Sequence, residues 1–300
     1  MKIIYDAPGQ TCNRLWSYVA LISKAITDND KVVILRFDRM INNFSNLLNS
    51  KYVSFPLYNA LMIKIIGIDK YLLIINRVFF NRFTHNWTLR YWSRRGEIVK
   101  GWDYRGIDLD LDKNKKQIKD IFTPDNFIVE NIDNVFCELR KIYEVIVGVH
   151  IRRGDYKTWL NGKYFYELQE YCLFMNKYSN KTNKRMCFFI CSDEKIDIDF
   201  FEGLNCYRLN QPSPIADLYA LSCCDRIMGP LSTFSRWASF IGEVPLLALE
   251  RDEYEIEDRF FSKVINLYKC ENGTEFINWT YIVEQQNKYE DSYTDFTTDK

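Results

Sequence analysis

The pattern of apolar and polar residues is clearest in residues 145–249. Short apolar runs alternate there with segments in which apolar residues recur every three or four positions. The short runs predict strands at 145–151, 186–191, 205–209, 226–229 and 244–249. The periodic segments predict helices at 164–178, 214–224 and 232–241. Strands that alternate with helices in this way are typical of a parallel sheet with helices on both faces, so a doubly wound α/β domain is expected.

The first part of the chain begins with the same alternation. Residues 2–7 and 31–37 carry the apolar runs of strands, and a helix is predicted between them at 12–27, where apolar residues recur at helical spacing. The pattern then predicts three further segments: mostly helical at 38–100, loop and turn at 101–125, and one helix at 125–141. Two domains are therefore expected, at residues 1–140 and 141–300, and the polar, acidic tail at 284–300 is expected to fray.

The charge balance and the distribution of apolar residues argue against a nucleic-acid-binding protein and against a membrane-spanning one. The 300 residues include 40 basic and 40 acidic side chains, which argues against a broad nucleic-acid-binding surface and requires any anion site to be local. The N-terminus lacks the apolar core of a signal peptide. The most apolar stretch, residues 57–75, is interrupted by Lys64, Asp69 and Lys70 and is too broken to span a bilayer. We expect a buried helix pair there and a cytoplasmic protein with at most peripheral membrane association.

Cysteine and histidine usage argues against a metal centre. The chain has nine cysteines and two histidines, His85 and His150, and no pair of C-x-x-C motifs. A zinc site is therefore not expected. We interpret the cysteines as reduced and mostly buried, as is usual in the cytosol.

Polar clusters follow three predicted strands of the second half, where a doubly wound sheet binds its ligands. The clusters are His150, Arg152, Arg153 and Asp155; Ser192, Asp193 and Glu194; and the turn at 229–233. Two arginines provide permanent charge and bidentate donors for a phosphate, and the turn leads into a helix N-terminus, which also favours anions. A carboxylate of the second cluster can accept hydrogen bonds from a base or a ribose. Together the clusters predict a pocket for a nucleotide diphosphate.

Each cluster also has a simpler interpretation. The arginine cluster can be a structural salt-bridge network, the Ser-Asp-Glu sequence a turn, and Ser232-Thr233 an ordinary helix cap. A competing chemical interpretation is a divalent-metal site at one of the D-x-D patterns, which occur at 108–112 and 197–199. The first of these lies in a charged loop without a preceding apolar strand, so a solvated acidic turn is the preferred interpretation.

Three stretches resemble the bacterial α-1,2-fucosyltransferases of glycosyltransferase family 11. "VGVHIRRGDY" is similar to their donor-binding motif and carries the H-x-R-R-x-D signature shared with α-1,6- and protein O-fucosyltransferases. "FFICSDE" resembles the strand that ends in a serine/threonine–aspartate pair, and "DLYALSCCDRIMGPLSTFSRWASFIG" resembles the final motif. Near the N-terminus, "PGQTCNRLWSY" stands where the family has a G-x-G-N-Q/R loop, with Thr11-Cys12 in place of the second glycine.

The resemblance implies a GT-B fold of two Rossmann-like domains facing across a cleft, in an inverting enzyme that needs no metal or other cofactor. The C-terminal domain would bind GDP-fucose and the N-terminal domain a glycan acceptor, in the closest resemblance a galactoside of a surface polysaccharide. The implied catalytic residues are Arg152 on the β-phosphate, Arg153 as second donor or structural brace, and Asp155 orienting them. The implied donor-binding residues are His150, Asp193, Glu194, Ser232, Thr233, Phe234, Ser235, Asn13 and Arg14.

Several points stay open from the sequence. The general base is not assigned, and its candidates are Asp6, Asp155 and Glu167. Transfer from another nucleotide sugar, and a non-catalytic nucleotide-sugar-binding role in polysaccharide assembly, are the alternative functions. Aromatic residues in 79–102 can stack on sugar rings, although core packing is their more frequent use.

Overall fold

The computed structural model describes residues 1–249 and 256–273 of the chain, and the tail expected to fray lies outside these residues. Its strands are β1 (Lys2–Ile4), β2 (Val32–Ile34), β3 (Val53–Ser54), β4 (Glu97–Val99), β5 (Val145–Ile151), β6 (Met186–Ser192), β7 (Cys206–Tyr207), β8 (Arg226–Gly229) and β9 (Leu246–Ala248). Its α-helices are α1 (Thr11–Asp28), α2 (Ser45–Leu48), α3 (Ala60–Ile66), α4 (Ile68–Phe79), α5 (His85–Ser93), α6 (Lys115–Ile121), α7 (Asn126–Ile142), α8 (Leu168–Ser179), α9 (Pro214–Cys223) and α10 (Thr233–Gly242).

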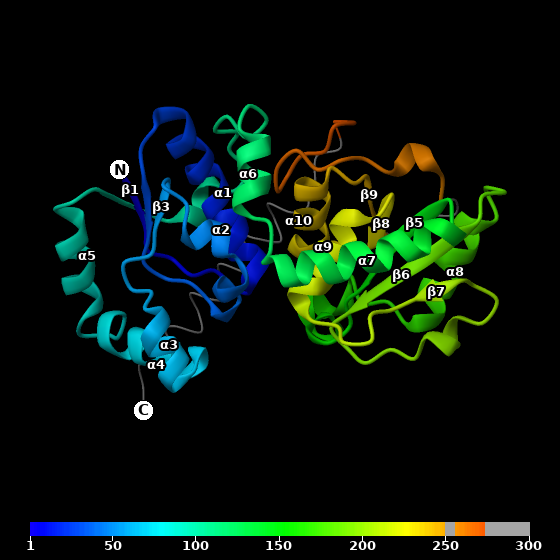
Figure 1. Ribbon diagram of the computed structural model, residues 1–300, viewed down its shortest axis with the longest axis horizontal. Helices are drawn as coiled ribbons and strands as arrows, with labels where there is room; N and C mark the ends of the chain where they lie inside the picture. The colour runs from blue at the N-terminus through cyan, green and yellow to red at the C-terminus, as the bar shows by residue number, and fades with distance from the viewer. Residues whose placement is uncertain (250–255, 274–300) are drawn as a thin grey trace.

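The strands form two parallel sheets, one in each half of the chain (Figure 1). The first has the order β3-β2-β1-β4 and the second the order β7-β6-β5-β8-β9, and every neighbouring pair is parallel. Both orders start with a 3-2-1-4 arrangement, which is the Rossmann arrangement. The prediction of two Rossmann-like units with parallel sheets is therefore confirmed.

The topology fixes where a ligand can bind. In such a sheet the strand order reverses between its first and fourth strands, and ligands bind beyond the carboxyl ends of the strands at that point. In the second sheet these strands are β5 and β8, which pair through Val147↔Arg226 and Val149↔Met228. The polar residues that follow β5 and β8 are therefore brought to one place.

The second half follows the sequence prediction closely. The predicted strands at 145–151 and 226–229 are confirmed without change, and the other elements differ by a few residues at their ends. The main difference is α8, which begins at Leu168 rather than at 164. Tyr164 and Tyr166 are both buried, a two-residue period that belongs to extended chain, and Glu167 then caps the helix in a capping box with Glu170.

The first half holds elements that the sequence did not predict. Residues 38–100 are mostly helical, as predicted, but they also contain β3 and β4, which have two and three residues and are too short to show a period. The predicted loop at 101–125 contains α6, where only Ile118 and Ile121 are buried among lysines. Both errors have the same cause, because elements of so few residues carry little hydrophobic periodicity.

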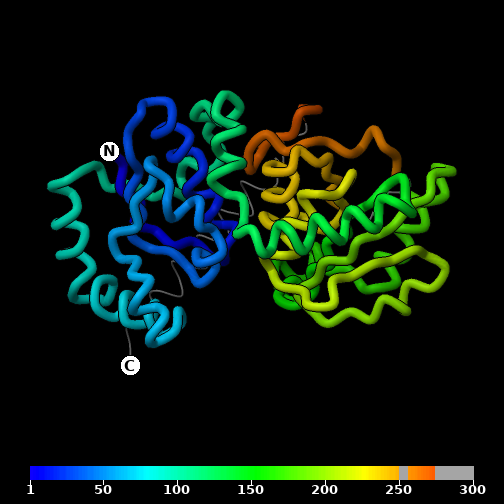
Figure 2. The backbone as a smooth tube through the Cα atoms, in the orientation of Figure 1, coloured from blue at the N-terminus to red at the C-terminus, as the bar shows by residue number. Residues whose placement is uncertain are grey.

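The two halves share one apolar core. Trp16 of α1 is fully buried and meets Trp237 of α10 edge-on at 5.2 Å between ring centroids, and Phe122 lies 5.0 Å from Trp237. The Trp16 indole also donates to the carbonyl of Thr233, at 3.2 Å. These contacts hold the start of α1 beside the start of α10. The tube view in Figure 2 shows these segments, early and late in the chain, meeting between the two sheets.

The division at residue 140 stays a prediction. Helix α7 carries residues on both sides of it and packs on α9, beside the second sheet (Figure 1). All nine cysteines are among the described residues; they are free, and most are buried. In the part of the chain that the structure describes, no helix is long and apolar enough to cross a membrane.

Candidate active site

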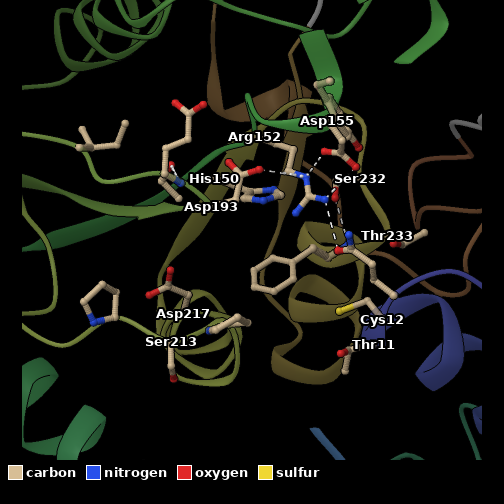
Figure 3. Close-up of a pocket in the computed structure, with 18 of the residues that line it drawn as sticks. Thr11, Cys12, His150, Arg152, Asp155, Asp193, Ser213, Asp217, Ser232 and Thr233 are labelled. Carbon is tan, nitrogen blue, oxygen red and sulfur yellow. Dashed lines mark hydrogen bonds and ion pairs between the residues drawn. The ribbon is translucent and has the colours of Figure 1, made fainter. Parts of the chain in front are cut away.

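A cavity of about 870 Å³ lies at the carboxyl ends of β5, β6 and β8. Residues at or after the ends of these strands line it, including His150, Arg152, Asp193 and Thr233. Residues 9–13 and Trp102, from the first half, complete the lining. Its size suits a nucleotide sugar, because ligand pockets typically measure about 300–1,000 Å³. The predicted clusters from three strand ends are therefore brought together (Figure 3).

Arg152 is held rigidly on the cavity wall. Its Nε and Nη2 atoms donate to the two carboxylate oxygens of Asp155 at 2.8 and 2.9 Å, and Nε lies 3.4 Å from Asp193 (Figure 3). Nη2 also donates to the Gln10 side chain at 3.3 Å, which links the two halves. Burial lowers the pKa of Arg152, but the hydrogen bond and charge of Asp155 outweigh it, so the pKa is raised overall.

One edge of this guanidinium is left for a ligand. Among the described residues, none hydrogen bonds to Nη1 of Arg152, although the side chain is only 18% exposed. A guanidinium that is fixed, charged and free on one edge is suited to a phosphate oxygen.

Arg153 points elsewhere. It is not among the residues that line the cavity. Its Nη2 donates to Glu167 at 2.9 Å, its guanidinium lies over the Phe165 ring, and its backbone N–H donates to Asp193 at 3.2 Å. Of the two roles left open by the sequence, these contacts favour the structural brace, because they tie the loop after β5 to the start of α8.

His150 is buried in contact with Phe234. The two rings lie 5.0 Å apart, and His150 is 3% exposed at the end of β5. Gly229 permits this placement, because a Cβ there would lie 2.7 Å from the carbonyl oxygen of His150. The Nδ1 atom of His150 is buried with no partner in the described structure, so it can hydrogen bond to a ligand in the cavity.

Burial, and secondarily the charge of Arg152, lower the pKa of His150 to about 3. Since the pKa of an unfolded histidine is about 6.5, the unfolded chain binds the proton first as pH falls. We expect His150 to lower the free energy of unfolding by about 2 kcal/mol between pH 7 and pH 5. Urea unfolding at both pH values should show that a His150→Phe variant loses this share of the pH dependence. A matched His85→Phe variant should keep it; equal slopes for wild type and His150→Phe would contradict the assignment.

The N-terminus of α10 faces the cavity. Ser232, Thr233 and Phe234 line it, and the buried Ser232 hydroxyl accepts from the Phe234 N–H at 3.1 Å as the helix cap. Ser235 differs from these residues. It is 1% exposed, donates to the Ser232 carbonyl at 3.3 Å and does not line the cavity. We therefore assign Ser235 to packing of the helix start.

Of the two donor-binding residues predicted near the N-terminus, Asn13 and Arg14, one lines the cavity and the other does not. Asn13 lines the cavity, where Gly9 has a φ of 41° and leaves room for the Asn13 amide. Arg14 does not line it. Its guanidinium lies 3.8 Å from Asp38 at the edge of a separate, small cavity, so its position favours a structural role.

The carboxylates proposed as general base are engaged in other contacts. Asp6 accepts from the backbone N–H groups of Gly101 and Trp102 at 2.8 and 3.0 Å, which fixes the end of β4 beside β1. Burial raises the pKa of Asp6. Glu167 caps α8 and pairs with Arg153, and neither Asp6 nor Glu167 lines the cavity. Asp155 does line it, paired with Arg152. Their contacts give all three carboxylates structural or orienting roles.

Asp193 and Glu194 both line the cavity, and their contact with the donor stays a prediction. Asp193 lies between the arginines of the first cluster, within 3.4 Å of the Arg152 side chain. The Glu194 carbonyl accepts from Arg208 at 2.6 Å, and both Glu194 and Arg208 line the cavity.

The D-x-D patterns are built differently from a metal site. Asp108 accepts from the Leu111 N–H at 3.0 Å, and Asp197 accepts from the Asp199 N–H at 3.1 Å, so each carboxylate closes a local turn. Within residues 1–249 and 256–273, no group of three or more metal-ligating side chains comes together. Neither pattern lines the large cavity.

The sequence interpretation missed Asp217. It lies in the first turn of α9, is 5% exposed and lines the cavity, and its Oδ1 atom has no partner among the described residues. Burial raises the pKa of Asp217 to about 7, and the nearby Arg208 limits the rise. A buried carboxyl group with an unused oxygen facing a cavity is a strong ligand contact. The signal was an acidic residue within the apolar face of a predicted helix.

Comparison with known protein families bears on the identity of this site. The model of the family described as "Glycosyl transferase family 11" matches residues 32–282, which is most of the chain. The chain belongs to glycosyl transferase family 11. The resemblance read from the three motifs is thereby confirmed, and the cavity is the candidate active site of a family 11 glycosyltransferase.

Several solved structures are similar to this family 11 protein. The structure of a mutant of Arabidopsis thaliana FUT1 in complex with GDP has a TM-score of 0.50 and 14% identity, covering 91% of this chain and 78% of that one. Fucosyltransferase NodZ from Bradyrhizobium has a TM-score of 0.48 and 19% identity, covering 82% and 94%. POFUT1 in complex with GDP-fucose has a TM-score of 0.46 and 11% identity, covering 80% and 93%. A search of curated protein sequences finds no match.

Proposed function

We propose that this family 11 protein is an inverting fucosyltransferase that uses GDP-fucose and needs no metal. In this proposal it forms an α-1,2 linkage to a galactoside during synthesis of a surface polysaccharide. The family membership and the motif resemblance support the donor and the linkage. GDP is also the ligand in the similar structure of the Arabidopsis thaliana FUT1 mutant.

The position of Arg152 carries the proposal. In fucosyl transfer the bond between the anomeric carbon and the β-phosphate oxygen breaks, and its electron pair passes to the leaving GDP. The transition state resembles an oxocarbenium ion, with negative charge growing on the phosphate. Arg152 is held by Asp155 and Asp193 at the strand end where a diphosphate would lie, with its Nη1 edge unused. A preorganised donor of this kind stabilises developing charge without having to reorient.

The start of α10 supports the same position for the diphosphate. Its first-turn N–H groups are not used in the helix ladder, and the helix dipole favours negative charge there. Thr233 lies at this end and faces the cavity together with Arg152 (Figure 3).

The position of Asp217 supports placing a guanine base at the end of the cavity away from Arg152. The edge of guanine carries a ring N–H and an exocyclic amino group, and a carboxylate can accept from both. Asp217 has an unused oxygen and lies away from Arg152, beside Ser213, in the same cavity (Figure 3). Uracil and adenine do not present these two adjacent donors, so this contact would select GDP-sugars.

An inverting reaction needs the acceptor on the face of the sugar opposite the leaving phosphate. Asn13 and Trp102 line the same cavity from the first half of the chain. Trp102 is the residue of the aromatic segment 79–102 that lines the cavity, and Trp159 lines it from the second half. Indole rings at these positions are suited to stacking on sugar rings.

The test is transfer from GDP-fucose to a panel of β-galactosides, with the product linkage and anomeric configuration determined by NMR. We expect an α-linked fucose on the galactose 2-hydroxyl. Transfer to another hydroxyl would correct the linkage alone, whereas transfer from UDP- or ADP-sugars but not from GDP-fucose would overturn the proposed donor.

Metal independence is tested separately. We expect EDTA to leave the initial rate unchanged, and an Asp110→Ala variant to keep wild-type activity, because Asp108–Asp112 forms a turn outside the cavity. Initial rates with EDTA and with added Mg²⁺ or Mn²⁺ measure this. The metal-dependent alternative would be favoured if EDTA abolished transfer, a divalent cation restored it, and the Asp110→Ala variant showed no transfer even with the cation.

A further inference from the structure

Helix α4 has two apolar faces. Its inner face packs against the protein through Tyr71 and Ile75, which are buried. Its outer face carries Leu73 and Ile74, which are 69% and 48% exposed, and Val78, near the C-terminal end of the helix and beside the inner face, is 48% exposed. Burial of the inner face explains why the helix folds here, but it gives no reason for apolar residues on the outer one. Large exposed apolar patches usually mark an interaction surface.

The neighbouring helices extend this outer surface. Helices α3, α4 and α5 follow one another in the chain; α3 and α4 lie at the lower edge of the first half, and α5 lies at its outer edge, away from the second sheet (Figures 1 and 2). On and beside α3 and α5, further large apolar side chains are exposed: Leu61, Met62, Ile65, Phe83, Trp87 and Tyr91. We call the exposed side chains of residues 60–95 the outer helical surface.

The outer helical surface is strongly basic. Residues 60–95 contain seven lysines and arginines, all exposed, and one acidic residue, Asp69, although the whole chain has equal numbers of basic and acidic residues. On α4, Lys70 and Arg77 share the helical stripe of Leu73 and Ile74. Arg90 of α5 and Arg94, which directly follows that helix, come three residues after Trp87 and Tyr91.

We propose that the outer helical surface docks on an anionic phospholipid bilayer. Helices that lie in a membrane interface combine leucine, isoleucine or tryptophan on one side with lysine and arginine beside them. Tryptophan and tyrosine favour the depth of the lipid headgroups, and the basic side chains reach anionic lipid. Trp87, Tyr91, Arg77 and Arg90 provide these groups on adjacent helices. The proposal is independent of the donor and of the reaction catalysed.

Charge argues against a second copy of the chain as the occupant. A two-fold dimer through this surface would place the same patch on both sides and bring its excess of positive charge together. Like charges facing each other across an interface oppose association. A flat anionic surface neutralises the charge while it covers the apolar residues.

Vesicle co-sedimentation tests the proposal with the full chain. We expect binding to vesicles of phosphatidylcholine with phosphatidylglycerol, weak or no binding to phosphatidylcholine alone, and weaker binding at about 0.5 M salt than at about 0.1 M. Absence of binding to the anionic vesicles at low salt would overturn the proposal.

Variants locate the surface. We expect Leu73→Ser/Ile74→Ser/Val78→Ser and, separately, Arg77→Gln/Arg90→Gln to lower the partition coefficient by about tenfold or more. A control on α7, Phe127→Ser, removes a side chain that is 76% exposed and should bind as wild type does. Thermal unfolding and circular dichroism report whether each variant is folded. Unchanged partitioning of both folded variants, or a wild-type dimer that the triple variant dissociates, would contradict a lipid surface as the occupant.

Discussion

Replacing Arg152 with alanine is expected to lower kcat for transfer from GDP-fucose by about 10²- to 10³-fold, or about 3–4 kcal/mol. The guanidinium is fixed by Asp155 and Asp193 before substrate arrives, so it stabilises the charge that grows on GDP without a reorganisation cost. Steady-state kinetics with GDP-fucose and a saturating galactoside measure the loss. A lysine at this position should recover only part of the rate, because it cannot keep both the bidentate pair with Asp155 and a phosphate contact.

Two other arginines serve as controls. Arg140→Ala breaks a comparable arginine–aspartate pair, to Asp225 on the outside of the second half, and should leave kcat unchanged. Arg153→Ala should affect thermal stability more than kcat, because Arg153 braces Glu167 outside the cavity. If Arg152→Ala kept near-normal kcat while Arg153→Ala lost it, the two arginines would have the opposite roles.

Asp217→Asn is expected to weaken GDP binding by about 10- to 100-fold, since it replaces a buried carboxylate with a group that opposes one guanine donor with another donor. Calorimetric titration of wild type and variant with GDP measures the change. Asp133→Asn on α7 removes an exposed carboxylate outside the cavity and is the matched control. Equal GDP affinity for wild type and Asp217→Asn would remove Asp217 from the base-reading role.

The pKa of Asp217 adds a pH signature to this prediction. Burial raises it to about 7 in the free protein, and guanine binds the ionised form. Below pH 7 the proton must leave before GDP binds, so we expect affinity to fall by up to about tenfold per pH unit, and to be flat above pH 8. Asp217→Asn should lose this dependence and keep only the weaker one that arises when the terminal phosphate of GDP takes up a proton, at a pKa of about 6. A pH-independent wild-type affinity between 5 and 8 would contradict this mechanism.

The raised pKa of Asp217 also makes the stability of the ligand-free protein depend on pH, and this stability falls with rising pH whereas GDP affinity rises. An acid whose folded pKa lies above its unfolded value stabilises the fold below the unfolded pKa, and that stability is lost as pH rises through about 7. At pH 8, Asp217→Asn should therefore raise the free energy of unfolding of the free protein, by up to about 3–4 kcal/mol. A variant that is more stable and binds GDP less well is the pattern expected for a functional buried charge.

The sequence predicted the second half better than the first for a physical reason. The strands at 145–151 and 186–192 are buried along nearly their whole length, so each is a mostly apolar run with a polar residue, His150 or Ser192, only near its end. In the first half β3 and β4 have two and three residues, and α6 buries two isoleucines among lysines. Their positions depend on contacts with distant segments, such as Asp6 with Gly101, which periodicity does not record.

The site shows the same contrast. Arg152, Asp193 and Thr233 could be placed from the sequence because each lies within four residues of the end of a strand, and parallel strands end at one edge of the sheet. Arg152 and Arg153 are adjacent in sequence, and only their contacts separate the one on the cavity from the one behind it. Asp217 comes from inside a helix, where neither a motif nor a strand end marked it.

Calorimetric titration of the wild-type protein with GDP, UDP and ADP, in the presence of EDTA, tests most directly that this cavity binds a guanosine diphosphate sugar. The account predicts binding of GDP without metal, with UDP and ADP at least about tenfold weaker because they lack the two guanine donors. Binding of none of the three, or of UDP only after a divalent metal is restored, would contradict it.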